Sequence, residues 1–185
     1  MRPSNRKPSV WGIVFCAFLM FGCYGIAWAE QELLTNTGFE LPITDELPPG
    51  WQKFSNTDVT FLSFGPESPT NPNMVFTIND ESNSIGYGLR SMFFPAQPGQ
   101  VYLASVRIKC ADGGIGTLYL DFTDEKGARI QSKTITSRSI AWETVSVTLE
   151  APAGTEMVSI ILYSQTVHVG KVSFDDASLV LVSSN

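Results

Sequence analysis

The stretch QVYLASVRIKCADGGIGTLYLDF, residues 100–122, decides the fold class. Apolar and polar residues alternate on both sides of its Gly-rich turn. One face carries Tyr102, Ala104, Val106 and Ile108, then Leu118, Leu120 and Phe122; the other carries Leu103, Ser105, Arg107 and Lys109, then Thr117, Tyr119 and Asp121. A period of two predicts half-buried strands, because successive side chains of a strand point to opposite faces of its sheet.

The same alternation recurs toward the C-terminus, at 143–150, 157–165 and 171–182. Turn signals rich in Gly and Pro separate these runs about every ten residues, and no segment shows a sustained helical stripe. Residues 42–84 are less regular, and we expect long loops there with strands around 59–64 and 74–79. The pattern predicts an all-β fold, an antiparallel β-sandwich or jelly roll.

The N-terminal segment is typical of an export signal. Arg2, Arg6 and Lys7 precede a long apolar run, and AWA at 27–29 offers the small residues that signal peptidase reads. We therefore expect a signal peptide at 1–29, one domain at 30–185, and a secreted or periplasmic product. Two alternatives are an uncleaved membrane anchor and a lipoprotein attached through Cys23.

Charge and cysteine content narrow the possible partners. The chain has 12 basic and 18 acidic residues, a net charge of −6. Loss of residues 1–29 removes three basic residues and no acidic one, which leaves a net charge of −9. This balance argues against nucleic acid and anionic lipid as partners. We expect no membrane insertion after cleavage, and no internal disulfide, because only Cys110 then remains.

Five segments together resemble a known family. They are LLTNTGFE followed by PPGW, then PGQVYLASVRIK, GTLYLDFTDEKG, WETVSVTLEAPAGTEMVSIILY and GKVSFDDASLV. In this order they resemble carbohydrate-binding modules of families four, nine and twenty-two, which have galactose-binding-like β-sandwich folds. The resemblance spans residues 30–185 and implies non-catalytic binding of a polysaccharide or oligosaccharide.

The resemblance also implies a structural calcium ion. In such modules a Glu of the first strand and an Asp of the last strand meet at the ion, which here would be Glu40 and Asp175, or Asp176 if the strand register differs. Carboxylates and carbonyl oxygens are the ligands that calcium prefers. The alternative is that Glu40 pairs with Lys171 or faces water at a strand edge.

A candidate binding face follows from the alternation. Residues opposite the apolar positions are Arg107, Tyr119, Asp121, Tyr163 and Gln165. Flat rings beside directional hydrogen-bonding groups suit a sugar. The alternative is a solvated face on which Tyr119 pairs with Tyr163, and Arg107 with Asp121, to stabilise the sheet.

Three further aromatic residues are candidates of different kinds. Trp51 and Trp142 occupy positions that pack in the resembled family, so we expect both to be structural. Tyr87 lies between Gly86 and Gly88, and the glycines would let a ligand approach its ring.

Enzymatic alternatives have little support in the sequence. The single histidine, His168, cannot form a zinc site by itself, and no GxSxG motif marks a nucleophile. Asp121 with Glu143 is the acid pair that a small polysaccharide hydrolase would use. The other alternative to carbohydrate binding is a structural or adhesive envelope protein with the same fold, acting with a separate cell-envelope or enzyme partner.

Overall fold

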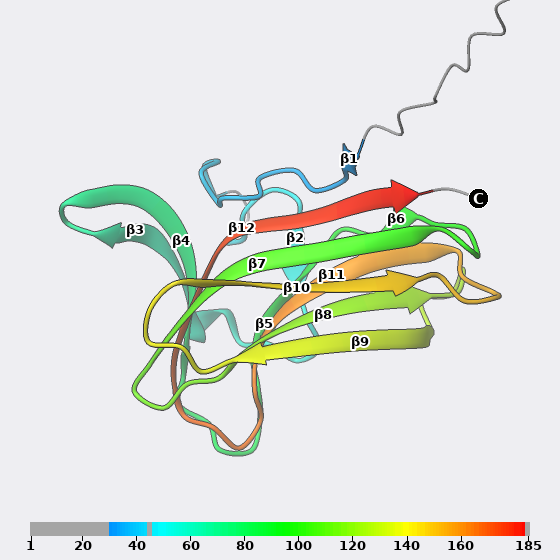
Figure 1. Cartoon of the computed structure of the whole chain (residues 1–185). Coiled ribbons are helices and arrows are strands. Elements are labelled where there is room, and N and C mark those ends of the chain that lie inside the picture. The colour runs from blue at the N-terminus through cyan, green and yellow to red at the C-terminus, as the bar shows by residue number, and fades with distance from the viewer. Residues whose placement is uncertain (1–29, 44–45, 184–185) are drawn as a thin grey trace, which may run out of the picture.

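The computed structural model describes residues 30–43 and 46–183, which form two facing antiparallel sheets (Figure 1). The predicted signal peptide and Cys23 lie outside the described residues. Within the described residues, no helix is long and apolar enough to cross a membrane.

The first sheet has the strand order β10-β7-β12-β4-β3, and the short strand β1 also pairs with β12. Its strands are β10 (Glu143–Glu150), β7 (Val101–Ala111), β12 (Gly170–Ser183), β4 (Asn71–Asp80), β3 (Leu62–Ser68) and β1 (Gln31–Glu32). The β3–β4 hairpin projects beyond the body of the sandwich (Figure 1).

The second sheet has the order β2-β5-β11-β8-β9, and β6 pairs with β11. Its strands are β2 (Trp51–Lys53), β5 (Gly88–Ser91), β11 (Met157–Ser164), β8 (Gly116–Thr123), β9 (Arg129–Ser137) and β6 (Phe94–Pro95). A single 3-10 turn, η1 (Val59–Phe61), precedes β3 among the described residues. The all-β antiparallel sandwich predicted from the alternation is confirmed.

The core lies between the sheets and takes in predicted inward positions of β7, β8 and β11, together with Phe174 of β12. From the first sheet it takes Ala104, Val106, Ile108 and Phe174, and from the second Leu118, Leu120, Phe122, Val158, Ile160 and Leu162, all fully buried. Each of the Val, Ile, Leu and Phe side chains in this set gains about 1.5–3 kcal/mol from burial.

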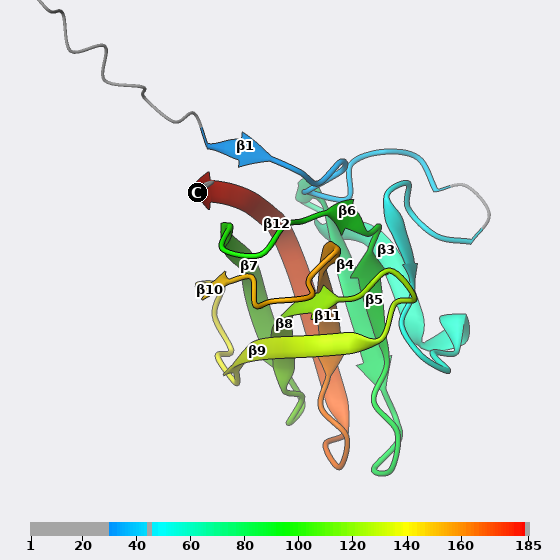
Figure 2. The same ribbon diagram turned by 90° about the vertical axis from the view of Figure 1, so that its right-hand side faces the viewer.

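The two ends of the described chain lie side by side, with β1 along β12 (Figure 2). Glu32 holds them together. Its Oε1 accepts from the backbone N–H of Leu34 and of Leu179, at 2.8 and 3.0 Å, and its Oε2 accepts from the Ser178 hydroxyl. A carboxylate of β1 thus helps to fasten the N-terminal segment in a domain that has no internal disulfide among its described residues.

Candidate functional site

Tyr119 and Tyr163 meet on the outer face of the second sheet, as predicted. They come from the neighbouring strands β8 and β11, and their rings are edge-to-face with centroids 6.0 Å apart. Gln165 lies beside them and donates from Nε2 to the Thr117 hydroxyl at 2.6 Å. The sequence prediction therefore placed these three residues together correctly.

The Tyr163 ring lies against the backbone of the neighbouring strand. A Cβ at Gly88 would fall 2.9 Å from the ring, and one at Gly86 would fall 2.4 Å from it. The Phe54 ring packs on the same ring in a T-shaped arrangement, with the two centroids 5.6 Å apart. The two glycines thus serve the close approach of Tyr163, which fixes the orientation of this ring before any ligand arrives.

Asp121 lies at the centre of an ionic cluster on the same face. The carboxylate is fully buried, and its Oδ2 accepts from Arg90 Nη2 at 3.1 Å and from Arg129 Nη2 at 2.7 Å. Its Oδ1 accepts from the Ser132 hydroxyl. A buried carboxylate with two guanidinium partners is satisfied, and it holds both arginines in place.

The two guanidinium groups also lie over aromatic rings. Arg90 is 5.0 Å from the centroid of Phe54 and 5.1 Å from that of Phe93, while Arg129 is 5.9 Å from that of Tyr119. We call this surface the aromatic–arginine face, formed by Phe54, Arg90, Phe93, Tyr119, Asp121, Arg129 and Tyr163.

Burial shifts the pKa of two groups on this face. It lowers the pKa of the Arg90 guanidinium, against the opposing effect of the Asp121 carboxylate. It also raises the pKa of the Tyr119 phenol, so this group is a neutral donor and acceptor at physiological pH. The face therefore presents defined hydrogen-bonding groups rather than a titrating pair.

Unpaired polar atoms are concentrated here. Among the described residues, the buried side-chain atoms without a hydrogen-bond partner are Arg90 Nε, Thr123 Oγ1, Thr155 Oγ1 and Ser159 Oγ. Ser159 of β11 is the register partner of Asp121 on β8, and Thr123 lies two residues beyond Asp121 on the same strand. Three of these atoms are hydroxyl oxygens, which can donate and accept, and Arg90 Nε can only donate; each buried polar atom without a partner costs about 1–3 kcal/mol.

One end of the aromatic–arginine face is hollowed. A pocket of about 240 Å³ is lined there by Phe93, Thr123, Met157 and the turn at 124–127. A ligand on the face could therefore extend along it toward this turn.

Arg107 does not belong to the predicted cluster. It lies on β7 of the first sheet, so the predicted pair with Asp121 on one sheet face is wrong. Instead its Nη1 contacts Asp175 at 3.4 Å and Asp176 at 3.1 Å. Alternation predicted the outward direction of the Arg107 side chain correctly, but it does not tell which of the two sheets a strand joins.

One of the three other aromatic predictions also needs correction. Tyr87 is buried in the core and stacks on Phe61 at 4.6 Å, so its ring is not open to a ligand. Trp51 is buried in the core as predicted. Trp142 is half-buried on the outer face of the first sheet, where its indole N–H donates to Glu67 and the Arg107 guanidinium lies 4.9 Å from its ring centroid, which agrees with the predicted structural role.

The three predicted calcium ligands surround Gly38. A Cβ at this glycine would lie 3.7 Å from Asp175 Oδ1 and 3.9 Å from Asp176 Oδ1. It would also lie 3.7 Å from Cγ of Glu40. A bulge in β12 allows two consecutive acids to approach the same point, with Asp176 in the left-handed region at φ 46°.

The predicted strand around Glu40 is absent. Phe39 has a φ of 58° and is buried, whereas Glu40 is exposed and outside any strand, with its Oε1 accepting from the Met74 N–H. Asp175 is the buried acid of the cluster, and burial raises its pKa despite its bonds from Asn73 and Arg107. No group of three acid, His or Cys side chains is close enough to form a metal site in 30–43 and 46–183. The oxygen donors suit calcium, although Arg107 already supplies positive charge.

Asp121 and Glu143 do not form a catalytic pair. They belong to different sheets, and Glu143 accepts a hydrogen bond from the Ser137 hydroxyl. Asp121 is occupied by its two arginines.

Sequence reasoning missed four residues of the aromatic–arginine face, namely Phe54, Arg90, Phe93 and Arg129. For Arg90 a signal was present, since it alternates with buried Leu89 and Ser91 in GLRS. The strand is only four residues long, and so short an alternation is hard to distinguish from a loop.

Comparisons with known proteins support the fold. No protein-family model matches the sequence, and no curated protein matches it. Among solved structures, the CBM22-1 xylan-binding domain of Xyn10C from Paenibacillus barcinonensis is similar, with a TM-score of 0.55 and 12% identity over 80% of this chain and 93% of that one. A carbohydrate-binding module of family 4 is also similar, with a TM-score of 0.52 and 16% identity over 80% of this chain and 98% of that one.

A larger protein is also similar, the enzymatically active domain of tailspike protein 4 from bacteriophage CBA120. Its TM-score is 0.61 at 14% identity, and the match covers 80% of this chain. The chain spans only 21% of that protein's length. Identities this low establish the fold alone. The chain has the galactose-binding-like β-sandwich fold of carbohydrate-binding modules.

Proposed function

We propose that this protein binds a polysaccharide or oligosaccharide on the aromatic–arginine face, without transforming it. The observation that carries the proposal is the juxtaposition of the Tyr119 and Tyr163 rings with the guanidinium groups of Arg90 and Arg129, which Asp121 holds in place. A sugar ring has an apolar C–H face that packs on an aromatic ring, and hydroxyl groups that need directional partners. The surface offers both within one sheet.

The similar structures support the same class of ligand. One of them is described as a xylan-binding domain, and others are carbohydrate-binding modules of the same fold. Fold alone does not fix a ligand, so the proposal depends on the residues of the face.

An affinity-gel screen of the full chain against soluble xylan, β-glucan, galactan and a polyuronate tests this proposal. At least one polysaccharide should retard the protein, and Tyr119→Ala and Tyr163→Ala should each weaken binding by about 1–3 kcal/mol, by analogy with aromatic stacking on nucleobases. This is roughly a 5- to 150-fold loss in affinity.

A matched control is Ile140→Ala, which truncates an exposed apolar side chain distant from the face in sequence. It should bind like the parent. The proposal would be contradicted if no polysaccharide retarded the protein, or if both Tyr variants bound as tightly as the parent. Release of reducing ends during the incubation would show an enzyme instead.

We further propose export of the protein with cleavage before Glu30. The charged, apolar and small-residue segments of 1–29 support this. Mass spectrometry of the exported product should give Glu30 as its first residue, whereas a lipid-modified Cys23 or an intact N-terminus in the membrane would overturn the assignment.

We also propose a structural calcium ion held by Glu40 and Asp175, with Asp176 as an additional or alternative ligand. Asp175 Oδ1 and Asp176 Oδ1 both lie close to Gly38, as does Cγ of Glu40, and this supports the site. The raised pKa of Asp175 supports it too, because a bound cation would relieve the buried charge. The ion would join the N-terminal segment to β12.

A further inference from the structure

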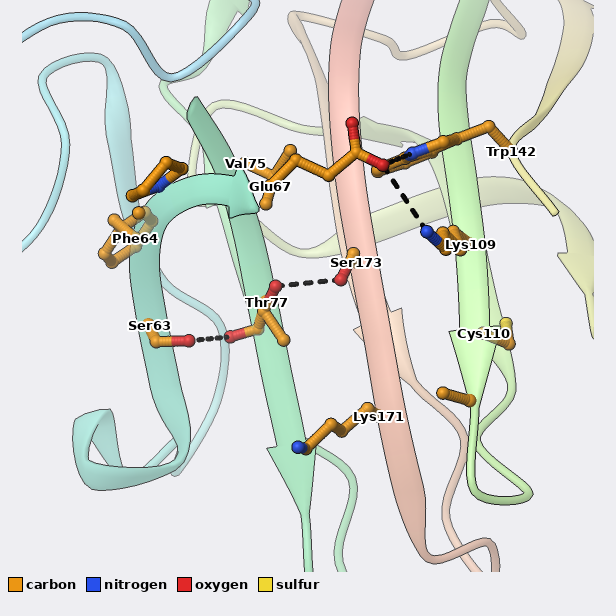
Figure 3. Close-up of a pocket in the computed structure, with 13 residues that line it drawn as sticks. Ser63, Phe64, Glu67, Val75, Thr77, Lys109, Cys110, Trp142, Lys171 and Ser173 are labelled. Atoms are coloured by element: carbon orange, nitrogen blue, oxygen red, sulfur yellow. Dashed lines mark hydrogen bonds and ion pairs between the residues drawn. The ribbon is translucent and has the colours of Figure 1, made fainter. Parts of the chain in front are cut away.

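A second pocket lies on the outer face of the first sheet, on the opposite side of the sandwich from the aromatic–arginine face. Figure 3 shows it between the β3–β4 hairpin and Trp142, the residue that precedes β10. Its volume is about 220 Å³. This space is large enough to admit one monosaccharide unit.

Glu67 of β3 closes one side of this pocket. Its Oε1 accepts from the Trp142 indole Nε1 at 2.6 Å and from Lys109 Nζ at 3.4 Å (Figure 3). The bond from Trp142 is the main reason that the pKa of Glu67 is lowered. These contacts hold the hairpin and the indole in fixed positions, so the wall of the pocket is pre-organised.

The floor of the pocket is a row of hydroxyl groups. Ser63, Thr77 and Ser173 pair in register across β3, β4 and β12, and Thr77 Oγ1 lies 2.8 Å from Ser173 Oγ. Each hydroxyl can donate one hydrogen bond and accept others. The row therefore offers several directional partners to a polyhydroxylated ligand.

The charge at this pocket is opposite to that of the protein as a whole. Lys109 and Lys171 line it with one acid, Glu67. Lys109 is paired with this acid, whereas the Lys171 ammonium makes no hydrogen bond or ion pair with the described residues. One ammonium group therefore remains uncompensated at the pocket, in a chain of net charge −6.

The pocket is open because residue 65 has no side chain. Gly65 has the same parity on β3 as Ser63, and a Cβ placed on it meets nothing within 4 Å. Its φ lies outside the left-handed region, so another residue can take its place without backbone strain. A larger side chain at this position would fill the pocket.

We propose that this pocket binds a single sugar unit carrying one negative charge, a carboxylate or a sulfate ester. Lys171 takes the anionic group, the hydroxyl row takes the ring hydroxyls, and Trp142 with Val75 forms the apolar wall. The site is independent of the aromatic–arginine face, since it uses none of its residues.

The test uses the indole N–H of Trp142 as a reporter, in NMR titrations of the full chain labelled with ¹⁵N-tryptophan. Trp142→Phe assigns the signal. The probes are D-glucuronate, glucose 6-sulfate and the neutral methyl glucoside. We expect saturable shifts of the Trp142 signal with one or both anionic sugars, and at least tenfold weaker binding of methyl glucoside; the preferred anion identifies carboxylate or sulfate as the ligand group.

Two variants localise the binding. Lys171→Ala should weaken it at least tenfold, and Gly65→Leu should abolish it while keeping the melting temperature. Lys53→Ala, an exposed lysine of the other sheet, is the matched control and should bind like the parent. Tyr119→Ala should also bind the anionic sugar unchanged, which separates this site from the first. No shift with either anion, equal binding of methyl glucoside, or unchanged binding in Lys171→Ala would overturn the proposal.

Discussion

Asp121 is a fully buried carboxylate whose charge is compensated by Arg90 and Arg129. Removing one member of such a cluster leaves the others buried without their partner, which is more costly than the cluster's net contribution to stability. The residue therefore serves the aromatic–arginine face by positioning the arginines.

We expect Asp121→Ala to lower the free energy of unfolding by about 3 kcal/mol, at the low end for a broken buried ion pair because Arg129 is 43% exposed and can turn to water. For a domain of this size the melting temperature should fall by roughly 6–12 °C. Calorimetry measures it, with Glu125→Ala in an exposed turn as control. Equal melting temperatures for the two variants would show that the cluster contributes nothing.

At the level of single residues, sequence reasoning succeeded where alternation was long and failed where a turn intervened. Tyr119 and Tyr163 were placed correctly because both lie on eight-residue strands. Glu40 was not, since the positive φ of Phe39 breaks the expected strand and no period reveals it. Tyr87 was misplaced because its flanking glycines accommodate the Tyr163 ring rather than a ligand.

Among the elements, the β3–β4 hairpin depends on an acid for its position. Glu67 reaches across the sheet to Trp142 and Lys109, and the hydrogen bond from Trp142 is the main cause of its lowered pKa. A lowered folded-state pKa means that the stabilisation is fully present above the ordinary value of 4.5 and is lost as the pH falls through the lower folded value.

The Trp142 environment should therefore stay unchanged from pH 7 to 4.5 and change below pH 4.5. Hydrogen exchange of the Trp142 indole N–H across pH 3–7, corrected for the intrinsic pH dependence of exchange, measures this. In Glu67→Gln the step below pH 4.5 should be absent, because the side chain no longer titrates. A step of the same size in that variant would assign the change to another acid.

The strands themselves were largely predictable, but their assignment to sheets was not. Alternation predicted β7, β8, β10 and β11, and their inward faces line or pack against the core. It could not tell that β7 and β8, joined by a short turn, belong to opposite sheets. Arg107 and Asp121 share the same parity, yet they lie on opposite outer faces of the sandwich.

For the whole molecule, the proposed calcium ion makes stability depend on free calcium. Binding only to the folded state stabilises it by about 2.7 kcal/mol at a hundredfold excess over the dissociation constant. Chelation should then lower the melting temperature by roughly 5–10 °C. Glu40→Gln should remove this dependence, and Glu125→Gln should keep it. If chelator leaves the parent's melting curve unchanged, Arg107 is the group that compensates Asp175 and no ion is needed.

The most direct test of carbohydrate binding on the aromatic–arginine face is a crystal structure of the full chain with an oligosaccharide from the most retarding polysaccharide. We expect a sugar ring packed on Tyr119 or Tyr163, with hydroxyl groups within hydrogen-bonding distance of the Arg90 or Arg129 guanidinium. An oligosaccharide bound elsewhere, with the aromatic–arginine face bare, would contradict it.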